Sequence, residues 1–375
     1  MQHMVRWLVC LATVAGVMSA SAFGDDWIEA DGLVECIARG DGSRAYVFTN
    51  GTVTATAKTQ LLATQYLVVG GGGGGGNTMG GGGGGGGVAS SDTAAFALAA
   101  GDSFSATVGA GGIYGSTGDW KVNGTNGGDS LLTIGGETIT ASGGVGGGSW
   151  DAGVSVRGGT GGGTSSTSGA SEQGYPGGAG VRDNSGGGGG GGGGGASEPG
   201  GDTSVADTRA GKGGEGRSIS ITGTPVVYGS GGGGGGSGNG FGNYFSNVGG
   251  ENAGDGTRNG NGGRGIDGTG GGGGGGGWNS AYLGGIGGCG TVIVVLEPPS
   301  ENLEIETPTV SSLLPDGATV NVKVRGIGAG ATSVTVTYRY GVDPENLDRT
   351  LVVAEGLTEP GVLRVTIADA NLAFT

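Results

Sequence analysis

The chain contains 375 residues, of which 104 are glycine, and its charged residues amount to only 13%, with a formal net charge of −15. Ordinary proteins contain roughly 7% glycine, so this composition argues against a conventional enzyme core and indicates a collagenous, low-complexity or specialised glycine-rich protein. The acidic excess also argues against nucleic acid and anionic lipid as partners, because negative charges repel one another.

The first 22 residues have the features of a secretory signal peptide. Arg6 precedes a short apolar run from Trp7 to Met18, and Ala20-Ser21-Ala22 is a small-residue cleavage site. A membrane-spanning helix is the alternative, but it needs about 20 apolar residues and this run is shorter. We therefore expect a secreted, extracellular protein, free or attached to the cell surface, with no transmembrane segment in the chain.

The only histidine, His3, lies inside this expected signal peptide. The mature chain then has no side chain that titrates near neutrality without a perturbed pKa, which rules out serine–histidine and cysteine–histidine catalysis and histidine-ligated metals. Carboxylate chemistry alone stays open. We expect no catalytic residue, no metal site and no cofactor.

Composition divides the remaining chain into four parts. These are an acidic lead-in over residues 23–41, a glycine-rich domain over 42–296, a linker over 297–302 and a Val/Thr-rich tail over 303–375. Pro298 and Pro299 mark the boundary before the tail, because proline interrupts regular structure.

Strands are expected at both ends of the glycine-rich domain. β-branched and aromatic residues over 44–56 flank Asn50-Gly51, a pair that favours a tight turn, and this pattern predicts a β-hairpin. Apolar strands are predicted over 65–69, running directly into Gly70, and over 290–296. Strands therefore bracket the glycine.

Glycine itself occurs in solid blocks of similar length, at residues 70–76, 80–87, 186–195, 231–236 and 270–277. Collagen is excluded, because its triple helix needs glycine at every third position and abundant proline. A flexible linker is one interpretation, since glycine has much backbone entropy to lose. The other is a lattice of extended three-residue-per-turn helices, which similar run lengths favour because such helices must pair sideways with one another.

The order of these segments resembles the glycine-rich domain of bacterial secreted proteins and phage tail-tip adhesins. The resemblance covers about residues 42–296 and rests on the segments 66–76, 98–112, 219–232 and 290–295. It implies that the glycine runs form stacked polyglycine II helices and that loops at one end contact a receptor. Those loops follow no fixed motif, so the resemblance implies a scaffold and not a ligand.

Two motif matches carry little weight in so glycine-rich a chain. Residues 210–213 approach a phosphate-binding loop but lack the Ser or Thr after Lys212 that would hold Mg²⁺. Residues 262–267 fit one turn of a calcium-binding β-roll, but tandem copies are absent and Arg264 stands within the turn, so a solvated loop is preferred.

Aromatic residues interrupt the glycine, and the candidate ligand-binding residues are Trp120, Trp150, Tyr244 and Trp278. Large rings provide contact area for a surface glycan or a protein receptor. The alternative is that they cap the glycine lattice, which lacks apolar side chains of its own.

Cys36 and Cys289 are the only cysteines after the expected signal peptide. In an exported protein such a pair favours a disulfide, and two separate thiols are the alternative.

The tail shows alternating patterns typical of strands at residues 319–324, 333–340 and 362–367. It resembles a fibronectin-type or immunoglobulin-like sandwich, a fold that has about seven strands. The sequence holds four or five, so an incomplete sandwich is expected.

The sequence as a whole predicts an all-β protein in which short strands bracket a polyglycine II lattice, followed by this partial sandwich. Its predicted function is non-catalytic display or adhesion at the cell surface. The alternatives are a carbohydrate-binding accessory region of a larger secreted enzyme and a glycine-rich structural protein of a wall or matrix.

Overall fold

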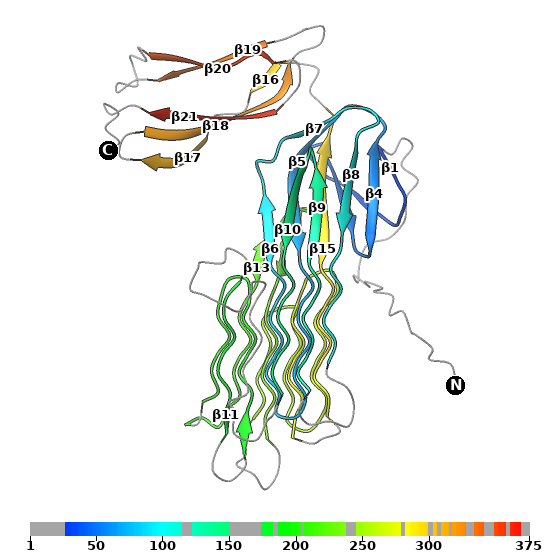
Figure 1. Ribbon diagram of the computed structural model, residues 1–375, viewed down its shortest axis with the longest axis vertical. Coiled ribbons are helices and arrows are strands. Elements are labelled where there is room, and N and C mark those ends of the chain that lie inside the picture. The colour runs from blue at the N-terminus through cyan, green and yellow to red at the C-terminus, as the bar shows by residue number, and fades with distance from the viewer. Residues whose placement is uncertain are drawn as a thin grey trace.

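The computed structural model describes residues 27–114, 122–149, 174–182, 187–204, 206–237, 245–278 and 282–298, together with the backbone of six strands between residues 303 and 368. Every regular element in this part of the chain is a β-strand, and the sheets are antiparallel (Figure 1). The all-β prediction is thus confirmed. Within the same residues no helix is both long enough and apolar enough to cross a membrane.

Two sheets form a sandwich at one end of the glycine-rich region. The first sheet has the order β1 (Ile28–Ala30), β4 (Thr52–Ala57), β8 (Ser103–Thr107), β9 (Ser130–Ile134) and β10 (Glu137–Ala141). The second has the order β2 (Glu35–Ala38), β3 (Arg44–Phe48), β15 (Thr291–Glu297), β5 (Leu61–Val69) and β6 (Val88–Ser91), with β7 (Phe96–Leu98) also paired to β5.

The main hydrophobic core lies between these sheets. In β4 the alternating sequence buries Val53 and Ala55 and leaves Thr52 and Thr54 exposed, as expected for a strand with one solvated face. Phe48 of the second sheet meets Phe104 of the first edge-to-face, with ring centroids 6.1 Å apart, a favoured aromatic geometry.

The predicted hairpin across Asn50-Gly51 is wrong, although the chain does turn there and Gly51 has a φ of 63°. β3 pairs with β2 and β15, whereas β4 pairs with β1 and β8, so the two strands belong to different sheets. Turn residues specify that the chain reverses direction, but not which strands pair with the two strands beside the turn. Folding the strands over each other buries their apolar faces in one core, which a flat hairpin would leave half exposed.

β5 and β15 confirm the prediction that apolar strands bracket the glycine. They are neighbours, with Val69 opposite Thr291 and Leu67 opposite Ile293. Both faces of these strands are covered, because the first sheet packs on one side and the pair β13 (Arg217–Ile219) and β14 (Val226–Tyr228) packs on the other. Continuous burial explains why their sequences are apolar without alternation.

The glycine segments extend from the strand ends as a bundle of long wavy runs (Figure 1). We use "glycine bundle" for the described residues within 70–87, 109–129, 142–216 and 229–290. Its central runs are buried throughout, for example residues 70–76 and 80–87.

Hydrogen bonds in the bundle repeat every three residues. Gly71 and Gly74 donate to residues 128 and 125, Gly72 and Gly75 donate to residues 288 and 285, and Gly73 and Gly76 donate to residues 84 and 81. Successive N–H groups therefore reach three different neighbouring runs in turn. A flexible linker would not bury and pair its backbone in this way.

Only glycine fits in these interior positions. A Cβ atom built on Gly83 would lie 2.6 Å from the carbonyl carbon of Gly73 and 2.8 Å from the carbonyl oxygen of Gly74. Such separations are shorter than van der Waals contact, so the close approach of the backbones requires the absence of side chains.

The tail contains β16 (Leu303–Ile305), β17 (Thr309–Leu314), β18 (Gly317–Ile327), β19 (Val334–Tyr340), β20 (Arg349–Leu357) and β21 (Gly361–Ala368). β16, β17 and β21 all pair with β18, and β19 pairs with β20. The predicted strands at 319–324, 333–340 and 362–367 coincide with β18, β19 and β21 and are confirmed as strands.

Candidate functional site

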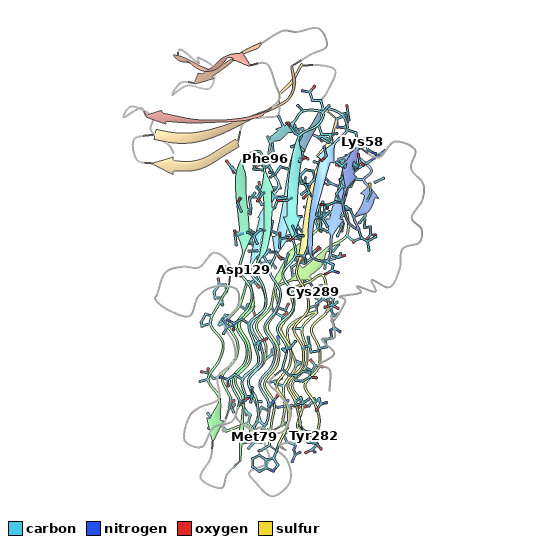
Figure 2. The ribbon with its side chains drawn as sticks, turned by 45° about the vertical axis from the view of Figure 1, so that its right-hand side comes forward. Lys58, Met79, Phe96, Asp129, Tyr282 and Cys289 are labelled. Carbon is cyan, nitrogen blue, oxygen red and sulfur yellow. The ribbon has the colours of Figure 1, made fainter. Side chains whose placement is uncertain are left out.

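The end of the glycine bundle that lies away from the sandwich, here called the tip, carries the candidate site. Runs 70–76 and 80–87 are antiparallel, which puts their connecting turn, residues 77–79, at the opposite end from β5 and β6. Figure 2 shows Met79 and Tyr282 together at this end, whereas Lys58 and Phe96 lie at the other end, in the sandwich.

The turn at residues 77–79 is buried and held by other runs. Thr78 and Met79 have φ values of 41° and 49°, a left-handed conformation that is costly for a β-branched residue. Asn77 donates its N–H to Ser149 Oγ at 2.9 Å and accepts from the N–H of Gly284 at 3.0 Å. These bonds fix the turn against two neighbouring run ends.

Aromatic and cationic side chains lie at the same end of the bundle, where the N–H of Met79 donates to the carbonyl of Gly277, the residue before Trp278. The N–H of Trp278 donates to the carbonyl of Arg258 at 3.1 Å, and Arg258 Nε donates to the carbonyl of Ser237 at 3.0 Å. The Arg258 guanidinium lies over the ring of Phe245, 4.9 Å from its centroid, and Phe245 is 50% exposed. Backbone contacts therefore position a cation–π pair at the surface of the tip.

Of the four predicted ligand-binding residues, Trp278 lies at the tip and is half-buried. Trp120, Trp150 and Tyr244 lie outside the described residues. Their described neighbours do lie at the tip: Ser149 precedes Trp150, Phe245 follows Tyr244, and the carbonyl of Val122, two residues after Trp120, accepts from Ser149 Oγ.

Arg258 was missed by sequence reasoning. No spacing or composition distinguishes it from the other arginines of the bundle, and only its stacking on Phe245 singles it out.

The structure keeps Cys36 and Cys289 apart. Cys36 is opposite Tyr46 in β3, which is opposite Val294 in β15, whereas Cys289 precedes β15. Five residues of extended chain separate Val294 from Cys289, or about 16 Å along the sheet, and a disulfide needs Cα atoms within about 7 Å. The disulfide was expected from the number of cysteines, and that number does not determine where the two residues lie along the paired strands.

The perturbed pKa values lie away from the tip. Burial raises the pKa of Tyr46 and of Tyr228 to about 12. Hydrogen bonding to Glu215 raises the pKa of Lys212, and the same contact lowers the pKa of Glu215. These shifts follow from packing and from one surface ion pair, and they do not mark a reactive group.

The two weak motifs serve the bundle itself. Asp267 binds Arg264 and accepts from the N–H of Cys289 at 3.0 Å. In the phosphate-loop candidate, Gly211 and Gly213 donate their N–H groups to residues 190 and 248. Among the described residues no group of three or more His, Cys, Asp or Glu side chains could hold a metal ion.

Comparison with known families gives one match. The sequence profile described as the glycine-rich domain matches residues 48–297, from the last residue of β3 to the last residue of β15. The matched unit thus includes most sandwich strands as well as the whole glycine bundle. A comparison with curated proteins gives no match.

Proposed function

This chain belongs to the glycine-rich domain family, and on that basis we propose that it is a secreted, non-catalytic protein of surface display or adhesion. A polyglycine II lattice forms its scaffold, and the tip of this lattice binds the ligand. The observation that carries the proposal is the tip itself, where Trp278, Arg258 and Phe245 are held by backbone bonds at the end of an otherwise side-chain-poor bundle.

The hydrogen-bond pattern supports a polyglycine II lattice. Residues 70–76 donate to three antiparallel runs and accept from three parallel runs, for example from Gly112, Gly144 and Gly273. A three-residue period with no bonds inside a run matches the extended left-handed helix, which rises about 3.1 Å per residue. Six hydrogen-bonded neighbours around one run form a close-packed array.

Selectivity requires side chains, and the interior of the bundle has almost none. Its backbone groups already bond to one another, so an interior run has no donor or acceptor left for a ligand. Exposed aromatic rings and a stacked guanidinium provide both contact area and directional bonds. We therefore assign binding to the tip, and we keep Trp120, Trp150 and Tyr244 as proposed ligand-binding residues on the basis of the sequence.

The partner proposed is a surface glycan or a protein receptor, since both are bound through aromatic rings. Secretion rests on the signal-peptide features of residues 1–22. For the tail we propose a partial fibronectin-type or immunoglobulin-like sandwich, which is supported by the antiparallel pairing of its strands around β18.

The test is a glycan array probed with the secreted chain, together with covalent cross-linking to cell-surface proteins. Trp278→Ala and Arg258→Ala should each weaken capture; a hot-spot ring accounts for about 2 kcal/mol, or roughly 30-fold in affinity. Tyr175→Ala is the matched control, because Tyr175 is 45% exposed but lies at the sandwich end of the bundle, where its N–H donates to Gly195. Equal binding by all three variants would remove the tip as the site.

The same experiment separates the alternatives. Specific capture of one glycan class through Trp278 favours a carbohydrate-binding accessory region of a larger secreted enzyme. Failure to capture any glycan or protein favours a structural component of a wall or matrix.

A further inference from the structure

Three side chains form a regular row on one side of the glycine bundle. Asn123, Asn126 and Asp129 stand at three-residue intervals, and each accepts a hydrogen bond through its Oδ1 atom. The donors are the N–H groups of residues 149, 146 and 143, at 2.8, 3.0 and 2.8 Å. We call this row the Asx ladder.

The ladder lies where the described part of the chain provides no further glycine run. Gly144 and Gly147 donate inward, to residues 71 and 74, whereas residues 143, 146 and 149 donate in a second direction, where no described run accepts from them. The two runs also bond directly, from Gly124 and Gly127 to residues 147 and 144. The exposed side chains of Asn123, Asn126 and Asp129 thus lie beside both runs, at the next position of the array.

A second row repeats the arrangement elsewhere. Asn261 and Asp267 accept from the N–H groups of Leu283 and Cys289, both at 3.0 Å. Arg264 stands midway between them, opposite Ile286, and among the described residues no acceptor is recorded for the Ile286 N–H. The runs here are parallel, whereas those of the Asx ladder are antiparallel, so the arrangement follows the three-residue period and not the chain direction.

We propose that the Asx ladder blocks a lateral docking surface whose natural occupant would be the glycine bundle of a second copy of this chain. Without the Asx side chains, the N–H groups of residues 143, 146 and 149 would form an unpaired row. Such a row resembles the exposed edge of a β-sheet, which is a template for adding another chain. The described runs present their carbonyl groups with the same three-residue period, so the outward-facing carbonyl groups of a second copy would recur at matching intervals. The side chains satisfy the row from within the molecule and keep the position filled.

The test is the triple variant Asn123→Ala, Asn126→Ala and Asp129→Ala in the full chain. Sedimentation should show dimers that increase with concentration, where the unaltered protein stays monomeric. Amide exchange at Gly143 and Gly146 should be faster under dilute conditions by about five- to tenfold, the effect of losing one hydrogen bond of about 1 kcal/mol. Gly144 and Gly147, which donate inward, are internal references.

Two further variants control for general damage. Asp129→Asn keeps the acceptor and should leave both readouts unchanged, and Asn259→Ala removes an exposed asparagine that lies outside the row. A folded triple variant that stays monomeric at every concentration overturns the proposal, as does unchanged exchange at Gly143 and Gly146. If the triple variant fails to fold, Asn126→Ala can be compared with Asn126→Asp, which keeps the acceptor. Association and faster exchange at Gly146 in Asn126→Ala alone support the proposal. Identical behaviour of the two variants overturns it.

Discussion

A single methyl group inside the glycine bundle should destabilise it strongly, and Gly83→Ala is the most direct case. Gly83 donates its N–H to Gly273 at 2.8 Å and accepts from Gly232 at 2.8 Å. The new Cβ would lie 2.6 Å from the carbonyl carbon of Gly73. Neither the contact nor the two bonds can survive without a shift of at least one run.

The size of the effect can be worked out from these contacts. Overpacking costs about 1–3 kcal/mol, and two weakened hydrogen bonds cost about 1 kcal/mol each. Alanine offsets this loss by about 0.4–1 kcal/mol, because it lowers the conformational entropy of the unfolded chain. The free energy of unfolding should therefore fall by about 2–5 kcal/mol, a large part of the 5–15 kcal/mol typical of a folded protein.

Chemical denaturation followed by circular dichroism measures this loss, with Gly260→Ala as the matched control. Gly260 belongs to the same bundle, its φ is not positive, and a Cβ built on it meets nothing within 4 Å. The free energy of unfolding of that variant should equal that of the unaltered protein or exceed it by up to about 1 kcal/mol. Equal losses in the two variants would refute the close-packed backbone array.

Three further changes address individual bonds. Arg264→Asn should add an acceptor between Asn261 and Asp267 in the second row and slow amide exchange at Ile286, which nuclear magnetic resonance can follow. An unchanged exchange rate would count against this role of the Asx side chains. Thr208 is exposed with a φ of 50°, so Thr208→Asn should raise the melting temperature through about 1 kcal/mol of relieved strain, and a lower melting temperature would contradict this reasoning. The pKa of Glu215 is lowered from its reference value of 4.5, so its ion pair with Lys212 stabilises the fold fully above pH 4.5 and is lost as the pH falls through the lower pKa of the folded state. Glu215→Gln should therefore reduce the dependence of the free energy of unfolding on pH in the acid range. An unchanged pH dependence in that range would refute the assignment.

Sequence reasoning located the strands well because burial leaves a local trace. The apolar segments before Gly70 and after Gly290 become β5 and β15, and the alternating tail segments become β18, β19 and β21. Pairing partners leave no such trace. The turn signal at Asn50-Gly51 was correct for the turn and wrong for the hairpin, since the choice between one sheet and two depends on the whole core.

The candidate site could be predicted only as a set of aromatic residues. Trp278 stands out because tryptophan is rare among glycines, whereas Arg258 acquires its role from a ring contributed by another segment. Likewise, the spacing of Asn123, Asn126 and Asp129 was present in the sequence. It gains meaning only when the partner run and its three-residue period are known.

The period of three explains how one scaffold can carry variable loops. Most interior positions accept only glycine, because a Cβ there would meet a neighbouring backbone, as at Gly72 and Gly75. Positions that face outward tolerate side chains, as Ala110 and Val145 show in runs that otherwise resemble the interior. The interior runs are joined mainly by backbone bonds, so a change in a loop at the tip leaves most of the contacts that define the array unchanged. Binding specificity can therefore change at the tip while the glycine bundle and its sandwich stay the same.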